Sequence, residues 1–541
     1  MKKLTVVFYV ALAISLVFIA WGFFAPDHVG YVLGGINDFI STNLGWFYLF
    51  ATTAFVIFAL FLIFGPYGRI RLGKPDERPE YSYFTWFAFL FTAGMGVGLV
   101  FFGVSEPLAH YYEPPSAEPE TVAATAESLQ YTLFHWGFHP WATYAVVALT
   151  LAYFKFRHQA PALISSAFTP LLGDRVKGGL GHTIDVLAVF ATVFGIATSL
   201  GLGASQITAG LSFTFEGLES NTTTELIVIL VVTGLFILSA STGLDRGIRY
   251  LSWTNIVLAI GLMLFVLILG PTVQIVESFS TTIGNYLQNL PSMTFSTNAF
   301  TGDREFLDAW TIFYWAWWIG WSPFVGTFIA RVSRGRTIRE FVIGVLAVPM
   351  LFSAIWFAVF GFSGISMDNQ EGGALYALMS EVGEEGALFA FLESLPLASI
   401  VIGITVLLIS SFFITSADSA TFVLGMLTTG GRLNPSLKVK IIWGLILAGT
   451  AAVLLFSGGL EALETAMIIA AFPFTFVVIA MGISLVKALS SEYDILLLES
   501  KQRDYDPEYQ RKSKRTLEEK RKEFEENMPD EDVEIEDEEK Q

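Results

Sequence analysis

Four tryptophans fall within seven residues of one segment, YWAWWIGWSPFVG, which runs from Tyr314 to Gly326. They are Trp315, Trp317, Trp318 and Trp321, and they lie inside a long apolar stretch. Tryptophan in membrane proteins is usually enriched at the two water interfaces, not in the middle of a span. A buried indole N–H also needs a hydrogen-bond partner. Simple apolar filling therefore explains the middle of this cluster poorly.

Clustered ring faces of this kind can bind a quaternary ammonium group. Such a cation donates no hydrogen bonds, and aromatic faces hold it by cation–π attraction worth about 2 kcal/mol or more per desolvated contact. Trp317 and Trp321 share a helix face with Trp310, and few acidic residues lie near mid-depth. A second stretch, HWGFHPWATYA, adds three aromatic residues: Trp136, Trp141 and Tyr144. Filling plus an interfacial belt remains the alternative for Trp310 and Trp136, which lie towards the ends of their stretches.

Alternating glycines interrupt another apolar stretch, FLFTAGMGVGLVFFGVSEP, at Gly94, Gly96 and Gly98. Close helix packing through small residues is the alternative interpretation, but the period of two favours a loosened backbone. Loosened backbone is tolerated at membrane depth only beside protein or a watery cavity. Its free N–H groups could bind the carboxylate of a zwitterion such as a betaine. We expect a second interruption at Gly320 and Pro323.

Two adjacent hydroxyl residues, Thr415 and Ser416, lie in the segment SFFITSADSATFVLG. Hydroxyls in a helix often bond carbonyls of the preceding turn, and this is the simpler interpretation. A sodium ion is hard and prefers oxygen ligands, which hydroxyls and unpaired carbonyls can supply. Asp418 in the same segment could relay protons or serve as a helix-packing partner. His135 and His139 are expected to line a cavity or support structure.

Long apolar stretches must position these residues. A bilayer-spanning helix needs roughly 20 apolar residues at about 1.5 Å each, whereas a barrel shows alternating ten-residue segments. The sequence therefore predicts an all-α polytopic membrane protein with twelve transmembrane helices. They are expected at 4–24, 44–64, 84–104, 133–154, 183–213, 226–244, 252–276, 309–330, 339–363, 395–426, 438–457 and 459–487.

Charge fixes the expected orientation. Nearly all Lys and Arg residues fall on one side of the twelve stretches, which predicts cytoplasmic N- and C-termini, and the outer loops, such as 105–127, are acidic. The net charge is −18, so no nucleic-acid partner is indicated. The tail holds a polar helix at 507–526 and a repulsive acidic end at 529–541. It is either simply solvated or an osmotic sensor that touches anionic lipid.

The two interrupted stretches lie five apart in the order of spans, which predicts two five-helix repeats of opposite orientation. The expected organisation has five parts. They are two N-terminal helices and a loop (1–83), a first repeat (84–276), an extracellular amphipathic connection (277–308), a second repeat (309–487) and a charged cytoplasmic tail (488–541).

Three segments carry a family resemblance: GMGVGLVFFGVSEPL (94–108), YWAWWIGWSPFVGTFIARVSRGRTIREF (314–341) and SFFITSADSATFVLG (411–425). They closely resemble the bacterial betaine/carnitine/choline transporter family. The resemblance implies a five-plus-five inverted-repeat core preceded by two extra helices, usually a homotrimer, in the bacterial cytoplasmic (inner) membrane. It implies transport of trimethylammonium compounds.

The resemblance also assigns residues. The central cage would comprise Trp317, Trp318 and Trp321, with Trp136, Trp141 and Tyr144 as fourth-span aromatics. Trp315 and Phe328 would line the path. One Na⁺ would bind the hydroxyls of Thr415 and Ser416 and the carbonyls of Thr92, Met95 and Phe412. A second would use Thr192 and the neighbourhood of Phe324. Ile196 stands where the family has another hydroxyl, which puts that second sodium site in doubt.

Two positions bear on the coupling ion. Proton-coupled choline members tend to carry Asp where this chain has Gly98, and sodium-independent carnitine exchangers carry Met where Val325 stands. The expectation is therefore Na⁺-coupled uptake of glycine betaine. A proton-coupled choline transporter and an importer of ectoine or carnitine remain alternatives. A channel fits an inverted repeat less well. An enzyme is not indicated, since the chain has no cysteine and its six histidines show no convincing ligand spacing.

Overall fold

A computed structural model describes residues 4–94, 96–215, 217–241, 245–300, 302, 304–503 and 507–528. These residues form helices joined by turns and loops, and they contain no strand. One isolated antiparallel bridge joins Arg71 to Thr337. The expected all-α class is confirmed.

Within the described residues, seven helices are long and apolar enough to cross a membrane, or eight if a bent pair counts as one span. The seven are α1 (Val6–Phe24), α2 (Pro26–Phe64), α8 (Gly179–Thr214), α9 (Thr222–Ser241), α13 (Ile338–Gln370), α16 (Ala398–Thr428) and α17 (Leu437–Arg503). The bent pair is α10 (Asp245–Leu269) and α11 (Thr272–Phe295), which turn by 112° at the intervening residues. The connection expected from residue 277 is thus already helical from Thr272.

The remaining helices are shorter or less apolar. The larger ones are α3 (Tyr83–Gly94), α4 (Val97–Tyr112), α5 (Val122–Trp136), α6 (Phe138–Ala152), α12 (Ile312–Val332) and α18 (Pro507–Glu526). The short ones are η1 (Pro66–Arg69), η2 (Tyr153–Arg157), η3 (Ser165–Phe168), α7 (Thr169–Leu172), η4 (Gly173–Lys177), η5 (Leu307–Thr311), α14 (Ala374–Val382), η6 (Glu384–Gly386) and α15 (Ala387–Glu393). The expected twelve spans exceed the seven or eight for three reasons: two expected spans are divided, two are joined in α17, and the continuous α12 is not among the helices that are apolar enough.

The two joined spans are the last ones. Helix α17 covers both, and its backbone leaves helical geometry at Gly458 and Gly459, where φ is 174° and 65°. The second value lies in the left-handed region that favours glycine. The break falls at the expected boundary between 457 and 459.

The expected break at the alternating glycines is confirmed. Helix α3 ends at Gly94, and α4 begins at Val97 after an extended Gly96. The next expected span is also divided, at Gly137, and this was not predicted. A Cβ on Gly137 would lie 2.4 Å from the Leu133 carbonyl oxygen and 2.6 Å from the Tyr286 hydroxyl. That hydroxyl accepts the N–H of Phe138 at 2.9 Å and so caps the start of α6.

The break expected at Gly320 and Pro323 is wrong, because α12 runs through both residues. Proline removes the N–H that would bond the carbonyl of Ile319. The hydroxyl of Ser322 donates to that carbonyl at 2.7 Å and replaces the missing bond. A Cβ on Gly320 would lie 2.2 Å from Met467 Cε, so this glycine serves close helix packing instead.

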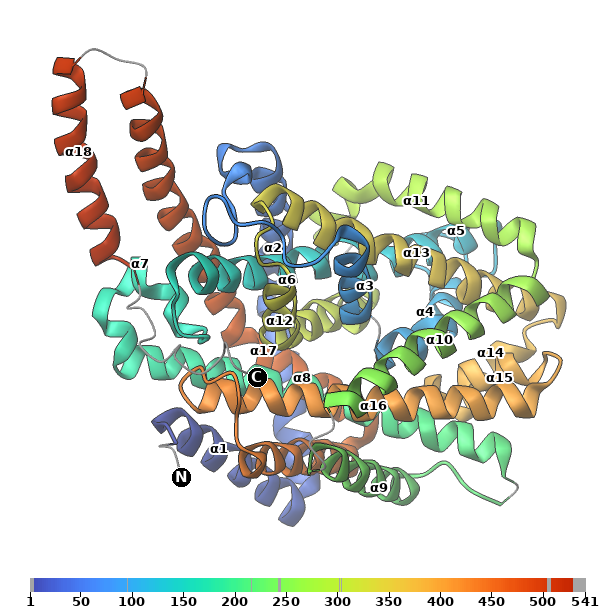
Figure 1. The fold of residues 1–541 in the computed structure, drawn as a ribbon. Helices are drawn as coiled ribbons and strands as arrows, with labels where there is room; N and C mark the ends of the chain where they lie inside the picture. Colours follow the sequence, from blue (N-terminus) through green and yellow to red (C-terminus); the bar gives the residue numbers. More distant parts are fainter. Residues whose placement is uncertain are drawn as a thin grey trace.

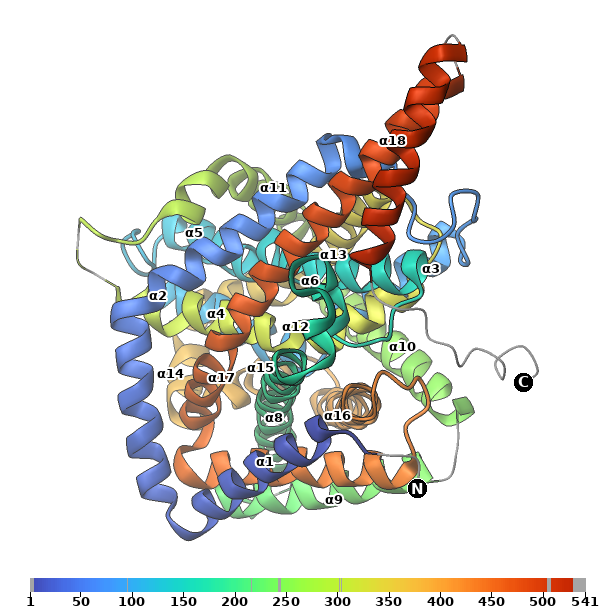
Figure 2. The same ribbon diagram turned by 90° about the vertical axis from the view of Figure 1, so that its left-hand side faces the viewer.

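Helices α8 and α16 lie side by side through the middle of the molecule, and Figure 2 shows both end-on. In Figure 1 the short helix α7 lies at the left end and α14 and α15 lie at the right end. Helix α18 stands at the same end as α7. A cavity of about 460 Å³ there is lined by Thr5, Ser165 and Glu525, so both terminal segments meet at one end of the protein.

Candidate substrate-binding site

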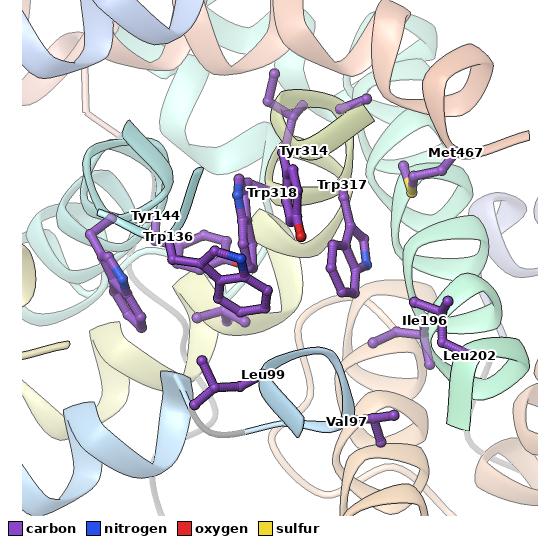
Figure 3. Close-up of a cluster of buried hydrophobic side chains, with 14 of the residues drawn as sticks. Val97, Leu99, Trp136, Tyr144, Ile196, Leu202, Tyr314, Trp317, Trp318 and Met467 are labelled. Carbon is purple, nitrogen blue, oxygen red and sulfur yellow. The ribbon is translucent and has the colours of Figure 1, made fainter. Parts of the chain in front are cut away.

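A group of aromatic side chains points into the protein where α5, α6 and α12 meet (Figure 3). We call it the ring cluster, and its members are the buried Trp136, Tyr144, Tyr314, Trp317 and Trp318 and the partly buried Trp321. Trp317 is 2% exposed and Trp318 is 8% exposed. The rings are therefore turned towards the protein interior and not outwards onto lipid, as the sequence predicted.

Trp318 is the centre of the ring cluster. Its ring centroid lies 4.9 Å from that of Trp136, 5.2 Å from that of Trp317 and 5.9 Å from that of Tyr144. Tyr314 lies nearly parallel to it at 6.1 Å. Ring centroids this close leave no room for a trimethylammonium group between two of these rings, so a cation could meet the rings only from one side. The cluster thus forms one continuous aromatic wall.

Every indole N–H of the predicted cage has a partner. Trp318 donates to the His135 carbonyl at 2.9 Å, and Trp321 donates to the Gly195 carbonyl at 2.8 Å. Trp317 donates to the Ser199 hydroxyl at 3.2 Å. The polar edges of the rings are satisfied by α5 and α8, which fixes the ring orientations.

The broken third stretch lies directly against these rings. A Cβ on Gly98 would be 2.3 Å from Trp317 Cη2, and one on Gly96 would be 4.0 Å from Trp321 Cη2. Figure 3 shows Val97 and Leu99 of α4 near the ring cluster. The predicted meeting of interrupted backbone and tryptophans is therefore present. Met95, one of the predicted sodium ligands, lies outside the described residues.

Other predicted aromatic residues lie further out. Trp315 stacks on His139 at 5.0 Å, and Trp141 meets Tyr144 of the ring cluster at 5.4 Å. Phe328 lies 6.4 Å from Phe89 of α3. Tyr314 was missed by the sequence prediction, although it precedes Trp317 and Trp318 by three and four residues, the spacing of a shared helix face.

A model of the betaine/carnitine/choline transporter family matches residues 6–494. The chain belongs to this family. It is 52% identical over 494 residues to the glycine betaine transporter OpuD of Bacillus subtilis (strain 168), covering 91% of this chain and 96% of that protein. It is 44% identical to a probable glycine betaine transporter of Desulfitobacterium hafniense (strain Y51), covering 91% and 99%. It is 41% identical to an ectoine/hydroxyectoine transporter of Virgibacillus pantothenticus, covering 90% and 96%.

Membership of this transporter family makes the chain a transporter and not an enzyme. In this transporter two of the hydroxyls predicted to bind sodium, those of Thr415 and Thr192, are turned onto their own helices. Thr415 donates to the carbonyls of Ser411 at 3.0 Å and Phe412 at 3.1 Å. The Thr192 hydroxyl donates in the same way to the Ala188 carbonyl. The predicted ligand atom of Thr92 is its carbonyl oxygen, and its hydroxyl donates to the Ala88 carbonyl. Donation leaves the lone pairs of each hydroxyl oxygen available, so these contacts are compatible with cation binding.

Two other predicted sodium residues, Ser416 and Phe324, lie on α16 and α12. Ser416 follows Thr415 in α16, and the Asn255 amide donates to the Thr415 hydroxyl at 3.3 Å. The Phe324 ring lies 5.6 Å from the Trp321 ring, and Trp321 in turn bonds Gly195 of α8, the helix that carries Thr192. Ile196 is fully buried in α8, so no hydroxyl stands at that position.

A fully buried carboxylate, Glu106, lies directly behind the ring cluster in this transporter, and the sequence prediction missed it. Residues 105–127 were expected to form an outer loop, but α4 continues to Tyr112 and Glu106 is 0% exposed. Its Oε2 accepts from Trp136 Nε1 at 2.8 Å and from the Tyr314 hydroxyl at 2.5 Å. The expectation of few acidic residues near the cage needs this correction.

Two histidines complete the surroundings of Glu106. Its Oε1 lies 2.7 Å from His135 Nδ1 and 3.3 Å from His110 Nε2, and all three side chains are fully buried. His135 Nε2 lies 3.0 Å from the Thr311 hydroxyl. The atoms of Glu106, His110 and His135 that could bind a metal ion lie within 4.8 Å of one another. The short Glu106–His135 contact is that of a hydrogen bond, so the group is held together without an ion. The signal in the sequence was the motif SEPLAH, in which Glu106 and His110 have helix spacing.

Proposed function

We propose that this transporter imports a quaternary-ammonium compatible solute, and that glycine betaine is the solute. The observation that carries the proposal is the inward-facing ring cluster, in which the indole N–H groups of the cage tryptophans all have hydrogen-bond partners. Stacked and edge-on indoles attract a trimethylammonium group through their negative faces. The interrupted backbone beside Gly96 and Gly98 would supply donors for the carboxylate of a betaine.

The relatives support this solute and define its competitors. Two of the most similar relatives are named for glycine betaine, one for ectoine and hydroxyectoine, and one for glycine betaine, proline and choline. Competition for uptake of labelled betaine by unlabelled betaine, choline, carnitine and ectoine identifies the solute. We expect betaine to compete best, and stronger competition by ectoine or choline would reassign the solute.

We further propose that uptake is coupled to Na⁺ bound by Thr92, Met95, Phe412, Thr415 and Ser416, with a second ion near Thr192 and Phe324. The close packing of Gly98 against Trp317 supports sodium over proton coupling, because an Asp there would collide with the ring. Uptake of labelled betaine into cells lacking other betaine carriers should collapse without sodium. Undiminished uptake in sodium-free medium, driven by a pH gradient, would favour the proton-coupled alternative.

We propose twelve spans arranged as two extra helices and two inverted five-helix repeats. Matching connections support the repeat. The second and third spans of the first repeat are joined by short helices at 165–177, and those of the second repeat by short helices at 374–393. These connections lie at opposite ends of the molecule (Figure 1), as opposite orientation requires.

We also propose that both termini are cytoplasmic, that the protein lies in the bacterial inner membrane and that it forms a homotrimer. The native chain has no cysteine, so single cysteines report topology without background. A cysteine near residue 170 should react from the cytoplasm and one near residue 380 from outside. The reverse pattern would refute the orientation. Native mass in mild detergent tests the trimer.

A further inference from the structure

We propose that Glu106 is the buried counter-charge of the transported cation, acting through the rings of Trp136 and Tyr314. The inference rests on the proposed function and adds a positioning residue to it. Glu106 is fully buried in α4, and it lies one ring away from Trp318, the centre of the ring cluster.

The hydrogen bonds show which oxygen carries the negative charge. An indole N–H can only donate, and Trp136 Nε1 donates to Glu106 Oε2. The Tyr314 hydroxyl donates a hydrogen bond to the same oxygen, Oε2. If the Glu106 carboxyl group holds a proton, that proton therefore lies on Oε1, in the hydrogen bond between Oε1 and His135 Nδ1. Oε2 faces the two ring donors as an acceptor in either case.

The charge on Glu106 has little to balance it when no solute is bound. Its ion-pair partners in the described part of the chain are His110 and His135, and each is neutral unless protonated. Burying an unpaired carboxylate is costly. A cation bound on the faces of Trp136 and Trp318 would offset that cost, so the carboxylate favours the occupied state.

The carboxylate of Glu106 also polarises the rings that donate hydrogen bonds to it. A donor that is hydrogen-bonded to a carboxylate is polarised, and electron density moves from the N–H or O–H bond into the ring. The faces of Trp136 and Tyr314 become more negative, which strengthens their attraction for a cation. Trp136 packs 4.9 Å from Trp318, and Tyr314 lies parallel to Trp318, so both polarised rings belong to the wall that the cation meets.

The experiment compares a cation with its uncharged twin. 3,3-Dimethylbutanoate has the shape of glycine betaine with carbon in place of the charged nitrogen. Both are titrated into the full chain in sodium buffer by tryptophan fluorescence, directly or in competition. Glu106→Gln keeps an oxygen for Trp136 and Tyr314 and an amide for His135, and it removes only the charge.

In Glu106→Gln we expect betaine affinity to fall about tenfold and affinity for the twin to change less than about twofold. The matched control is Glu113→Gln, an exposed acid at the end of the same helix, which should leave both affinities unchanged. An equal loss for both ligands in Glu106→Gln would mean a merely structural role and would overturn the inference. So would no loss for either.

Further variants keep the test decisive. If Glu106→Gln does not fold, the second variant is Trp136→Phe, which keeps a ring but removes the N–H. The ratio of betaine affinity to 3,3-dimethylbutanoate affinity should then fall. An unchanged ratio overturns the inference. If the wild type binds choline instead of betaine, choline and 3,3-dimethylbutan-1-ol make the same comparison. Wild-type protein that binds no quaternary ammonium compound refutes the proposed function itself, and this inference with it.

Discussion

Trp318 and Trp321 contribute different parts of the ring cluster. Trp318 meets three other rings within 6 Å, whereas Trp321 meets Trp317 edge-on at 6.3 Å and bonds the Gly195 carbonyl. We expect Trp318→Ala or Trp321→Ala to weaken betaine binding about tenfold or more, because each loses a cation–π contact of about 2 kcal/mol. Fluorescence titration measures the affinity.

A tryptophan outside the cluster provides the control. Trp46 is 45% exposed, and its N–H bonds a carbonyl of its own helix, so Trp46→Ala should leave affinity unchanged. Wild-type affinity in both Trp318→Ala and Trp321→Ala would count against the ring cluster as the binding site.

Gly98 tests how tightly the broken stretch packs. An added methyl group would lie 2.3 Å from Trp317 Cη2, so the ring or the backbone must move. Overpacking of this kind costs about 1–3 kcal/mol. We expect Gly98→Ala to lower both thermal stability and betaine affinity. Gly34→Ala is the control, since no atom lies within 4 Å of its Cβ position. Equal behaviour of the two variants would show that the site tolerates the shift.

Thr415 tests the proposed sodium site. Thr415→Val keeps the shape and removes the oxygen, so about tenfold more sodium should be needed for half-maximal uptake, with betaine affinity at saturating sodium nearly unchanged. Thr421→Val on the same helix removes a hydroxyl that bonds only the Asp418 carbonyl among the described contacts, and it should leave the sodium dependence as it is. A normal sodium curve in Thr415→Val would remove this residue from the site.

At the scale of elements, α12 shows why a proline need not break a helix. The hydroxyl of Ser322 bonds the carbonyl that Pro323 leaves without an N–H. Ser322→Ala should therefore destabilise the protein by about 1 kcal/mol and shift Trp321, which is adjacent in sequence. Thermal unfolding and betaine affinity measure the two effects. Ser363→Ala on α13 is a buried control whose hydroxyl has no hydrogen-bond partner in the described structure. An equally small effect in both variants would contradict the bridging role.

The elements that the sequence predicted are those whose cause is local. The breaks at the alternating glycines 94–98 and at Gly458–Gly459 were both predicted from the local sequence, and Gly459 adopts the left-handed geometry that favours glycine. The division at Gly137 depends on Tyr286, which lies far along the chain, and no local pattern contains it. The intact α12 was mispredicted because proline was weighed without its serine neighbour.

The residues of the candidate site were likewise predicted where the cause is local and missed where it depends on distant contacts. Tryptophan spacing on one helix predicted the inward rings, because a shared face follows from helix geometry. The role of Glu106 could not be predicted, since it arises from contacts with Trp136 and Tyr314 on two other helices. An acidic residue followed by proline looks like a loop until the fold buries it.

At the scale of the whole molecule, the tail packs against the transport domain. The predicted polar helix at 507–526 is confirmed as α18, and it runs beside the end of α17 (Figure 1). Lys520 Nζ lies 3.0 Å from Asp494 of α17, and the Phe524 ring lies 5.2 Å from the ring of His158. Burial and the neighbouring Arg157 lower the pKa of His158 to about 3, so this histidine is neutral at physiological pH. The acidic end at 529–541 lies outside the described residues.

This packing makes the sensor hypothesis testable. Helix α17 continues from the tail into the core, where it packs against α8 and α12, so a docked α18 can restrain it. If the tail is an osmotic sensor, deletion of 507–541 should raise betaine uptake at low osmolality towards the stimulated rate. Deletion of 529–541 alone keeps α18 and should preserve the activation curve. Uptake measured against osmolality compares the two truncations. An unaltered curve after the larger deletion would mean that the tail is only a solvated appendage, whatever its contacts with α17.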